Sequence, residues 1–272
     1  MRPVAVVGNL SRDRVDGGPP RVGGSPYYAG RALRLVGCRG VVVTKCAEAD
    51  RAALLPPLVA LGLPVKWRPS SATAAFAFRY ENGTRVMSIE ALGEPWSPDD
   101  VRGWVGEALR RVEWIHLGAL ARSDVSAETL AALARGGRRI SLDGQGLVRP
   151  SRTGPLELDD GFERELLRHV SVLKLAEEEA RVLLGGEPGR AALRALRVPE
   201  VVITLGPRGS LVFAEGRLEQ VAARPVERAD PTGAGDAYAA AYIAGRNAGQ
   251  PPVAAARRAT AFVAALLSGE SR

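Results

Sequence analysis

The chain has 272 residues, of which 46% are hydrophobic, and a formal net charge of +7. This length can bury a large core, so we expect the chain to fold on its own. The positive charges are scattered arginines with only three lysines, which argues against a nucleic-acid partner. Neither an apolar stretch of 18 residues nor a signal peptide is found, so we expect a cytoplasmic protein without a membrane partner. Cys38 and Cys46 match no metal-ligand spacing and are expected to be reduced.

Short β-branched segments alternate along the chain with segments of helical length rich in Ala, Leu and Arg. Helices are expected at 27–36 and 126–136, and the strand candidates, in chain order, are residues 4–7, 40–44, 113–118, 139–143, 170–175 and 200–206. This alternation predicts an α/β fold whose mainly parallel sheet is covered by helices on both faces. In such sheets ligands bind beyond the carboxyl ends of the strands.

One region breaks this alternation. In TAAFAFRYENGTRVMSIE, residues 73–90, aromatic residues recur at every second position and are followed by an Asn-Gly pair, the strongest short hairpin signal. We predict a small β-sheet lid formed by about 12–22 and 73–96, and an edge hairpin of the main sheet is the alternative. The apolar face of the hairpin predicts a homodimer through two lids.

A helix start with unusual chemistry lies in RADPTGAGDAYAAAY, residues 228–242. Gly233 and Gly235 let the backbone turn sharply, so the amides of Gly233, Ala234, Gly235 and Asp236 are expected to converge and form an anion hole. The helix dipole should lower the pKa of Asp236 and keep the carboxylate ionised. Asp236 would then accept a proton from a substrate hydroxyl while the amides hold a transferring phosphoryl group. A simple helix cap is the alternative role.

A second glycine pair precedes the first predicted helix. Ser25 suits the N-cap of a helix over 26–36, which places Gly23 and Gly24 directly before the helix start. Two glycines there allow a ligand to approach the backbone closely. Asp13 can accept hydrogen bonds from two neighbouring hydroxyls of a polyol, and an ordinary turn aspartate is the alternative.

These segments give the chain a resemblance to the ribokinase-like (PfkB) sugar kinases. DPTGAGDA is similar to the family's C-terminal signature DTxGAGD, and the other matching segments, in the family's order, are VVGNLSRD (6–13), VGGSPYYAGRALRLVG (22–37), SLDGQGLVR (141–149), LKLAEEEA (173–180) and VVITLGPRGSLVF (201–213). The resemblance implies a ribokinase-like three-layer fold in a single domain over 1–272. It also implies that ATP and Mg²⁺ are used to phosphorylate a hydroxyl of a small sugar or polyol. A nucleoside kinase of the same family and a non-catalytic sugar-binding descendant are the alternatives.

The resemblance also assigns roles, residue by residue. Asp236 matches the catalytic base, and Gly233, Ala234 and Gly235 match the anion hole beside it. The remaining roles are substrate contact by Asn9, Asp13, Gly23 and Gly24, nucleotide contact by Lys174, Thr204, Gly206 and Gly209, a magnesium-bound water on Glu179, and a monovalent cation such as K⁺ near Asp230.

Several positions depart from the family pattern. Ala176 replaces a frequent Asn near the magnesium site, so the neighbouring glutamates would share its role, and 261–269 lacks an Asn often found beside the adenine. VVGNLSRD, GGSPYYAG and LKLAEEEA are together similar to the inositol kinase branch. The aromatic residues of 76–96 keep a nucleoside open as the acceptor. His116 is expected to be a core histidine, with a role in the substrate pocket as the alternative.

Motifs of competing enzyme classes do not occur. The chain has no GxxxxGK[ST] loop, no GxGxxG after its first strand and no GxSxG elbow. A P-loop kinase, a dinucleotide-binding dehydrogenase and a serine hydrolase are therefore disfavoured.

Overall fold

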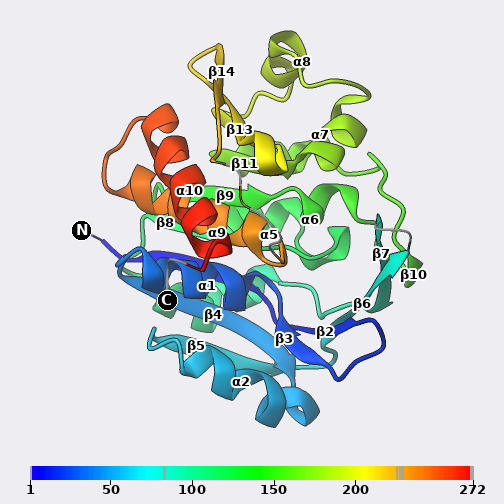
Figure 1. Ribbon diagram of the computed structural model, residues 1–272. Helices are drawn as coiled ribbons and strands as arrows, with labels where there is room; N and C mark the ends of the chain where they lie inside the picture. The colour runs from blue at the N-terminus through cyan, green and yellow to red at the C-terminus, as the bar shows by residue number, and fades with distance from the viewer. Residues whose placement is uncertain (1, 82–83, 225, 227–229, 270–272) are drawn as a thin grey trace.

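The computed structural model describes residues 2–81, 84–224, 226 and 230–269, so the predicted Asn-Gly turn lies outside the described residues. A nine-stranded sheet forms the centre, in the order β14-β13-β12-β11-β9-β8-β1-β4-β5 (Figure 1). Seven strands run parallel: β1 (Val4–Asn9), β4 (Gly40–Ala47), β5 (Val65–Ser70), β8 (Trp114–Leu117), β9 (Arg139–Asp143), β11 (Val172–Ala176) and β12 (Glu200–Thr204). The hairpin of β13 (Ser210–Ala214) and β14 (Arg217–Val221) continues the sheet antiparallel to β12. The predicted α/β architecture is confirmed.

Helices cover both faces of this sheet, as the continuous apolar strands require. In β1, Val4 and Val6 face one layer while Ala5 and Val7 face the other. The first layer holds α1 (Ser25–Leu35), α2 (Arg51–Val59), α9 (Ala234–Asn247) and α10 (Pro252–Leu267). The second layer includes α5 (Ala127–Ala134), α6 (Gln145–Val148), α7 (Glu177–Leu184) and α8 (Arg190–Ala195).

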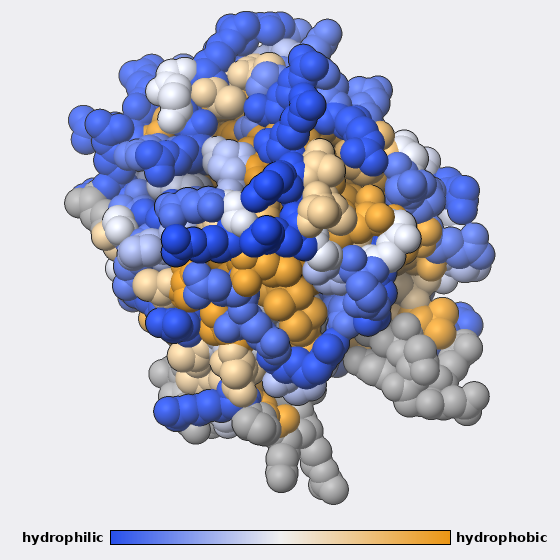
Figure 2. All heavy atoms as spheres, turned by 90° about the horizontal axis from the view of Figure 1, so that it is seen from above, coloured by the Kyte–Doolittle hydropathy of each residue, from blue (hydrophilic) through white to orange (hydrophobic). Residues whose placement is uncertain are grey.

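Short helical segments complete the chain. They are η1 (Glu48–Asp50), α3 (Pro98–Asp100), η2 (Val101–Val105), α4 (Gly106–Ala108), η3 (Arg122–Asp124), η4 (Arg164–His169) and η5 (Gly206–Arg208). Seen from above, hydrophilic side chains cover most of the surface and hydrophobic ones show in the spaces between them (Figure 2). Within the described ranges no helix is long and apolar enough to cross a bilayer. Cys38 and Cys46 are both buried and free.

A second sheet forms the predicted lid. Its order is β10-β7-β6-β2-β3, with β2 (Ser11–Val15), β3 (Arg21–Gly23), β6 (Ala74–Glu81), β7 (Thr84–Ala91) and β10 (Gly154–Pro155). Phe76 and Phe78 are buried beside Ile89 and Leu120. The apolar face expected to pair two lids is thus covered within the chain, so it gives no support to the homodimer, which stays an untested prediction.

Two local predictions need correction. Ser25 is the first residue of α1 and not its N-cap, because Gly24 occupies the cap with a φ of 87°. Trp96 is expected in the lid, but β7 ends at Ala91. Trp96 forms an isolated bridge to Val125 and is buried in the core between the main sheet and its second layer of helices.

Candidate active site

Side chains from three neighbouring strands and one helix meet where α9 begins. Asp143 ends β9, and its carboxylate pairs with the ammonium group of Lys174 on β11 at 3.2 Å. His116 on β8 and Asp236 in the first turn of α9 complete the group, and ligand atoms of His116, Asp143 and Asp236 lie within 4.8 Å of one another. The position agrees with the rule that ligands bind beyond the carboxyl ends of parallel strands.

Asp236 has the electrostatics of a general base. Burial raises the pKa of Asp236 to about 6, with Asp143 adding to the shift and Lys174 opposing it. The expectation that the helix dipole would lower this pKa is therefore wrong, because burial and a neighbouring carboxylate outweigh the dipole. A carboxylate with a pKa near the working pH is well matched to proton transfer.

Lys174 supplies the positive charge of this centre. Burial alone would lower the pKa of Lys174, but Asp143, Glu179 and Asp236 raise it above its usual value, so the side chain stays charged. Burial likewise raises the pKa of Glu179, while Lys174 acts against that shift. A Cβ on Gly235 would lie 2.7 Å from Nζ of Lys174, so the ammonium group rests directly on the first turn of α9.

The amides before Asp236 form a smaller anion hole than the sequence predicts. The amide of Ala234 donates to the carbonyl of Pro231 at 3.0 Å and is not free for a ligand. Within the described chain, the amides of Gly233, Gly235 and Asp236 have no hydrogen-bond partner, as expected at a helix start. Gly233 is the N-cap with a φ of 76°, and a Cβ there would lie 2.2 Å from the ring of Tyr28. Three amides without a partner and, beside Gly235, the Lys174 ammonium therefore lie together at the start of α9.

Asp13 faces this centre from the lid. Its carboxylate is buried, accepts a hydrogen bond from Ser11 at 2.7 Å and covers Gly23, where a Cβ would lie only 2.1 Å from a carboxylate oxygen. The Tyr28 ring lies beside Gly233, and its pKa is raised first by burial and then by the charges of Asp13 and Asp236. The site therefore presents two carboxylates, Asp13 from the lid and Asp236 from α9.

Asn9 and Gly24 hold the boundary between the main sheet and the lid. The side-chain amide of Asn9 donates to the carbonyl of Glu94 at 3.0 Å, while its Oδ1 is buried without a partner among the described residues. A Cβ on Gly24 would lie 2.5 Å from the carbonyl of Asn9, so the glycine is required there by protein packing. Both predicted substrate-contact residues are thus also parts of the lid connection.

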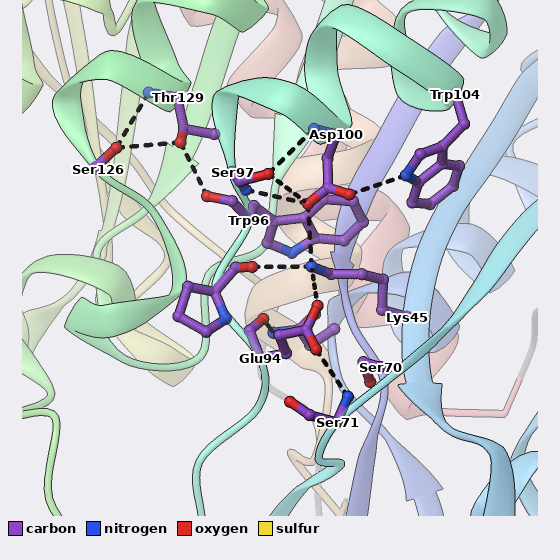
Figure 3. A network of polar contacts seen from close by, with 12 residues as sticks. Lys45, Ser70, Ser71, Glu94, Trp96, Ser97, Asp100, Trp104, Ser126 and Thr129 are labelled. Carbon is purple, nitrogen blue, oxygen red and sulfur yellow. Dashed lines mark hydrogen bonds and ion pairs between the residues drawn. The ribbon is translucent and has the colours of Figure 1, made fainter.

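A buried lysine fixes the same connection (Figure 3). The Lys45 ammonium donates to Glu94 and Asp100 at 3.2 Å each and to the carbonyl of Pro95 at 2.8 Å, and it lies 4.7 Å from the Trp96 ring centre. Glu94 also accepts from the amide of Ser71, which precedes β6. Lys45 therefore holds both ends of the β6–β7 hairpin to the main sheet.

The residues predicted for the nucleotide lie farther along the sheet. The Thr204 hydroxyl donates to the carbonyl of Leu175 at 3.3 Å, and Gly206 opens η5. Gly209 has a φ of 94°, and a Cβ there would lie 1.9 Å from the carbonyl of Val221, so packing alone requires this glycine. Lys174 is grouped with Asp236 instead of with these residues.

Asp230, predicted near a monovalent cation, caps a turn. Its carboxylate accepts from the amide of Thr232 at 3.0 Å, which fixes the chain just before the glycines of α9. Asp230 also contributes to the raised pKa of Tyr28, after burial and the nearer carboxylates. The turn at Asp230 therefore lies near Tyr28 and the start of α9.

Sequence reasoning gave no individual role to Asp143 or Arg149, and it expected His116 to be a core histidine, with a place in the substrate pocket as the alternative; His116 is fully buried in this centre. Burial lowers the pKa of His116 to about 4, so its imidazole is neutral. Asp143 ends a predicted strand, a position that could have marked it. Arg149 opposes the raised pKa of Asp236 and Glu179, and its guanidinium lies 5.7 Å from the ring centre of Phe76 in the lid.

Comparisons with known proteins agree with this geometry. The chain is 32% identical over 142 residues to a fructokinase of Klebsiella pneumoniae, covering 49% of this chain and 46% of that protein. It is 33% identical over 149 residues to an inositol 3-kinase of Zea mays, covering 53% of this chain and 38% of that protein. The matched stretches thus span less than half the length of these relatives.

Solved structures show the same fold. A pyrophosphate-dependent kinase in the ribokinase family, solved with a pyrophosphate analog and myo-inositol, has a TM-score of 0.84 at 23% identity and covers 97% of this chain and 94% of its own. The family model for pfkB family carbohydrate kinases matches residues 112–271, more than half of the chain. The chain therefore belongs to the pfkB family of carbohydrate kinases.

Proposed function

We propose that the protein transfers a phosphoryl group to a hydroxyl of a small polyol, with Asp236 as the base. The observation that carries this proposal is the position of Asp236 among three unpaired amides and the Lys174 ammonium. Asp13 also lies near Tyr28, where it can accept hydrogen bonds from acceptor hydroxyls.

The proposed reaction balances at named groups. Asp236 takes the proton of the acceptor hydroxyl as that oxygen bonds to phosphorus, and the bond from phosphorus to the donor's bridging oxygen breaks. The amides of Gly233 and Gly235 and the Lys174 ammonium stabilise the charge on the transferring group. The leaving group departs with the electron pair of the broken bond.

The residues fit a magnesium ion held through water. Glu179 is buried, its carboxylate is fixed by the Ala176 amide at 2.7 Å, and carboxylate oxygens are ligands that Mg²⁺ prefers. Glu177 is instead paired with Arg181 and Arg208, so it does not share the role expected of it. When bound, the metal neutralises charge on the donor phosphates. A monovalent cation near Asp230 remains part of the proposal.

The acceptor proposed is a hydroxyl-rich ring of the inositol kind. A relative named inositol 3-kinase and a structure solved with myo-inositol support it. A nucleoside remains the alternative, but Phe76 and Phe78 pack inside the lid and Trp96 lies under Lys45. These three rings are therefore engaged by the protein and do not offer an open slot for a base.

Two phosphate donors are consistent with the centre. ATP is the donor that the family resemblance implies, and pyrophosphate is favoured by the likeness to a pyrophosphate-dependent kinase. The amides and the Lys174 ammonium around Asp236 would bind phosphate oxygens, which both donors have, and would not bind a nucleobase. They can therefore serve either donor. A panel of both donors against polyols, sugars and nucleosides, with and without magnesium, decides between them.

Asp236→Asn tests the assignment once a substrate pair is known. The amide keeps an acceptor at the helix start, so stability should change by no more than about 1 kcal/mol, while turnover should fall by about 10²- to 10⁴-fold. Asp160→Asn, at an exposed aspartate, is the matched control. Near-wild-type turnover in Asp236→Asn would refute the base. Acceptor binding without turnover by the wild-type protein would favour the non-catalytic alternative.

A further inference from the structure

Two adjoining hollows lie at the amino-terminal edge of the main sheet, away from the lid. The larger has a volume of about 600 Å³ and is floored by the starts of β1, β4 and β5, and the smaller, of about 370 Å³, runs along β5. In Figure 1 this edge is on the left and the lid on the right. Since β4 has eight residues, the larger hollow, at the start of this strand, is separated from its carboxyl end by about 25 Å, whereas the smaller hollow extends along β5 as far as Arg68.

Unpaired arginines surround the larger hollow. Arg34, Arg39, Arg110 and Arg111 line it, and over the described part of the chain none of their guanidinium groups has an ion pair. Glu107 is the one carboxylate among the lining residues of either hollow. One carboxylate does not balance four guanidinium charges, so positive charge is in excess around the larger hollow. Guanidinium groups bind phosphate oxygens in a two-pronged geometry.

The smaller hollow adds aromatic surface to this charge. Trp67 and Trp104 line it together with Lys66 and Arg68, and it shares Arg110 with the larger hollow. The guanidinium of Arg68 lies 5.5 Å from the ring centre of Trp104. A planar base can stack on a guanidinium or on the indole that the guanidinium covers.

We propose that these hollows form a second ligand site, which binds a nucleoside phosphate. The phosphates would lie among Arg34, Arg39, Arg110 and Arg111, and the base would lie in the smaller hollow against Arg68 and Trp104. Volumes of this size are typical of small-molecule sites. The cations gather around two joined hollows and do not follow a stripe, which favours a small ligand over a nucleic acid.

Charge reversal at two lining arginines tests the site in the full chain. The double variant Arg110→Glu and Arg111→Glu is compared with Arg190→Glu and Arg194→Glu, an equal charge change on exposed α8 residues outside the hollows. ADP, adenosine and inorganic pyrophosphate are titrated by calorimetry, with tryptophan fluorescence as the local signal. Arg39→Glu is the second variant if the first pair does not fold.

The expected result is an ADP binding event, separate from any ADP binding at the active centre, that weakens at least tenfold in the Arg110 and Arg111 pair and persists in the control pair. Turnover should be unchanged in both, since these residues are outside the active centre. Adenosine should not produce this event, and pyrophosphate should produce it more weakly than ADP. Equal ADP binding by both pairs would overturn the proposal. Pyrophosphate binding as tight as ADP at this site, or tighter binding of a single-stranded oligonucleotide, would overturn the assignment to a nucleoside phosphate.

Discussion

Replacing Lys174 by Met should lower the stability of the protein by removing the positive charge of the active centre. Lys174 is the cation that lies among Asp143, Glu179 and Asp236, and the Met side chain has a similar length without the charge. The variant leaves the buried Asp143 without its ion-pair partner and removes the positive charge near the buried Glu179 and the half-buried Asp236. Removing one member of a buried ion pair is far more costly than replacing both, because the remaining charge stays desolvated.

The size of the loss follows from the geometry. At 3.2 Å from Asp143 and an effective dielectric constant of about 20, the attraction to that carboxylate alone is about 5 kcal/mol. Part of this is returned because the lysine no longer has to be desolvated. A net loss of about 3–5 kcal/mol in the free energy of unfolding is expected, a large share of a typical stability of about 5–15 kcal/mol.

The loss should depend on pH in a defined direction. Without Lys174 the pKa values of Glu179 and Asp236, which burial already raises, should rise further above their unfolded values, near 4. The folded state then holds protons that the unfolded state has released, so the variant is most stable at low pH and weakens as the pH rises through the folded pKa values. Urea unfolding at pH 5.5 and pH 8 should therefore show the larger deficit at pH 8.

Lys66→Met is the control, because Lys66 is exposed and outside this centre. It should change stability by less than about 0.5 kcal/mol at either pH. A Lys174→Met variant as stable as the wild type at pH 8, or equally destabilised at both pH values, would refute the electrostatic account of the centre.

Three further predictions concern the base and the lid. The kcat/KM of the wild-type enzyme should fall as the pH decreases through about 6, because Asp236 must be ionised to accept a proton and its pKa is raised to about 6; a flat profile between pH 5 and 7.5 would contradict this. Gly23→Ala places a Cβ 2.1 Å from the Asp13 carboxylate, so the KM for the acceptor should rise tenfold or more in steady-state kinetics, whereas Gly186→Ala, with open space around it, should leave KM unchanged. Lys45→Met should lower the free energy of unfolding by about 2–3 kcal/mol, measured by urea denaturation, and unchanged stability would show that the lid connection does not depend on this side chain.

The sequence predicts the parts of the fold whose residues are buried on both faces. The apolar runs of β1 and β4 are confirmed as central strands because few other structures accommodate them. The edge strand β5 was not predicted, because it is half exposed and therefore lacks a continuous apolar run, and because it contains a proline, which is unusual inside a strand. The hairpin of β13 and β14 was not predicted either, because its turn, Glu215-Gly216 with both residues at positive φ, is not one of the Asn-Gly or Asp-Gly pairs that signal such a turn.

The candidate site shows the same division between local and distant information. The turn at Gly233 and the position of Asp236 follow from a short stretch of sequence, so they could be predicted. The raised pKa of Asp236 could not be predicted, because it depends on burial at the carboxyl ends of the strands and on Asp143, which only the packed strands bring close. The engagement of the Ala234 amide is a further detail of turn geometry that the glycine pattern does not determine.

The charges around Asp236 indicate whether the phosphate donor binds alone or together with a cation. Three carboxylates, Asp143, Glu179 and Asp236, lie near one buried ammonium group, and Arg149 acts on Glu179 and Asp236. Without a ligand, negative charge is therefore already in excess, and burial has raised the pKa of Asp236 and Glu179. A bare polyphosphate would add to that excess and raise the pKa of Asp236 further, which would protonate the base that the reaction needs. The free amides of α9 and Lys174 compensate for only part of this charge, so under the proposed mechanism we expect the phosphates to bind together with a cation. Donor binding and the ionisation of Asp236 are thus coupled, and the acid limb of kcat should lie at a higher pH than the limb of kcat/KM when the cation is limiting.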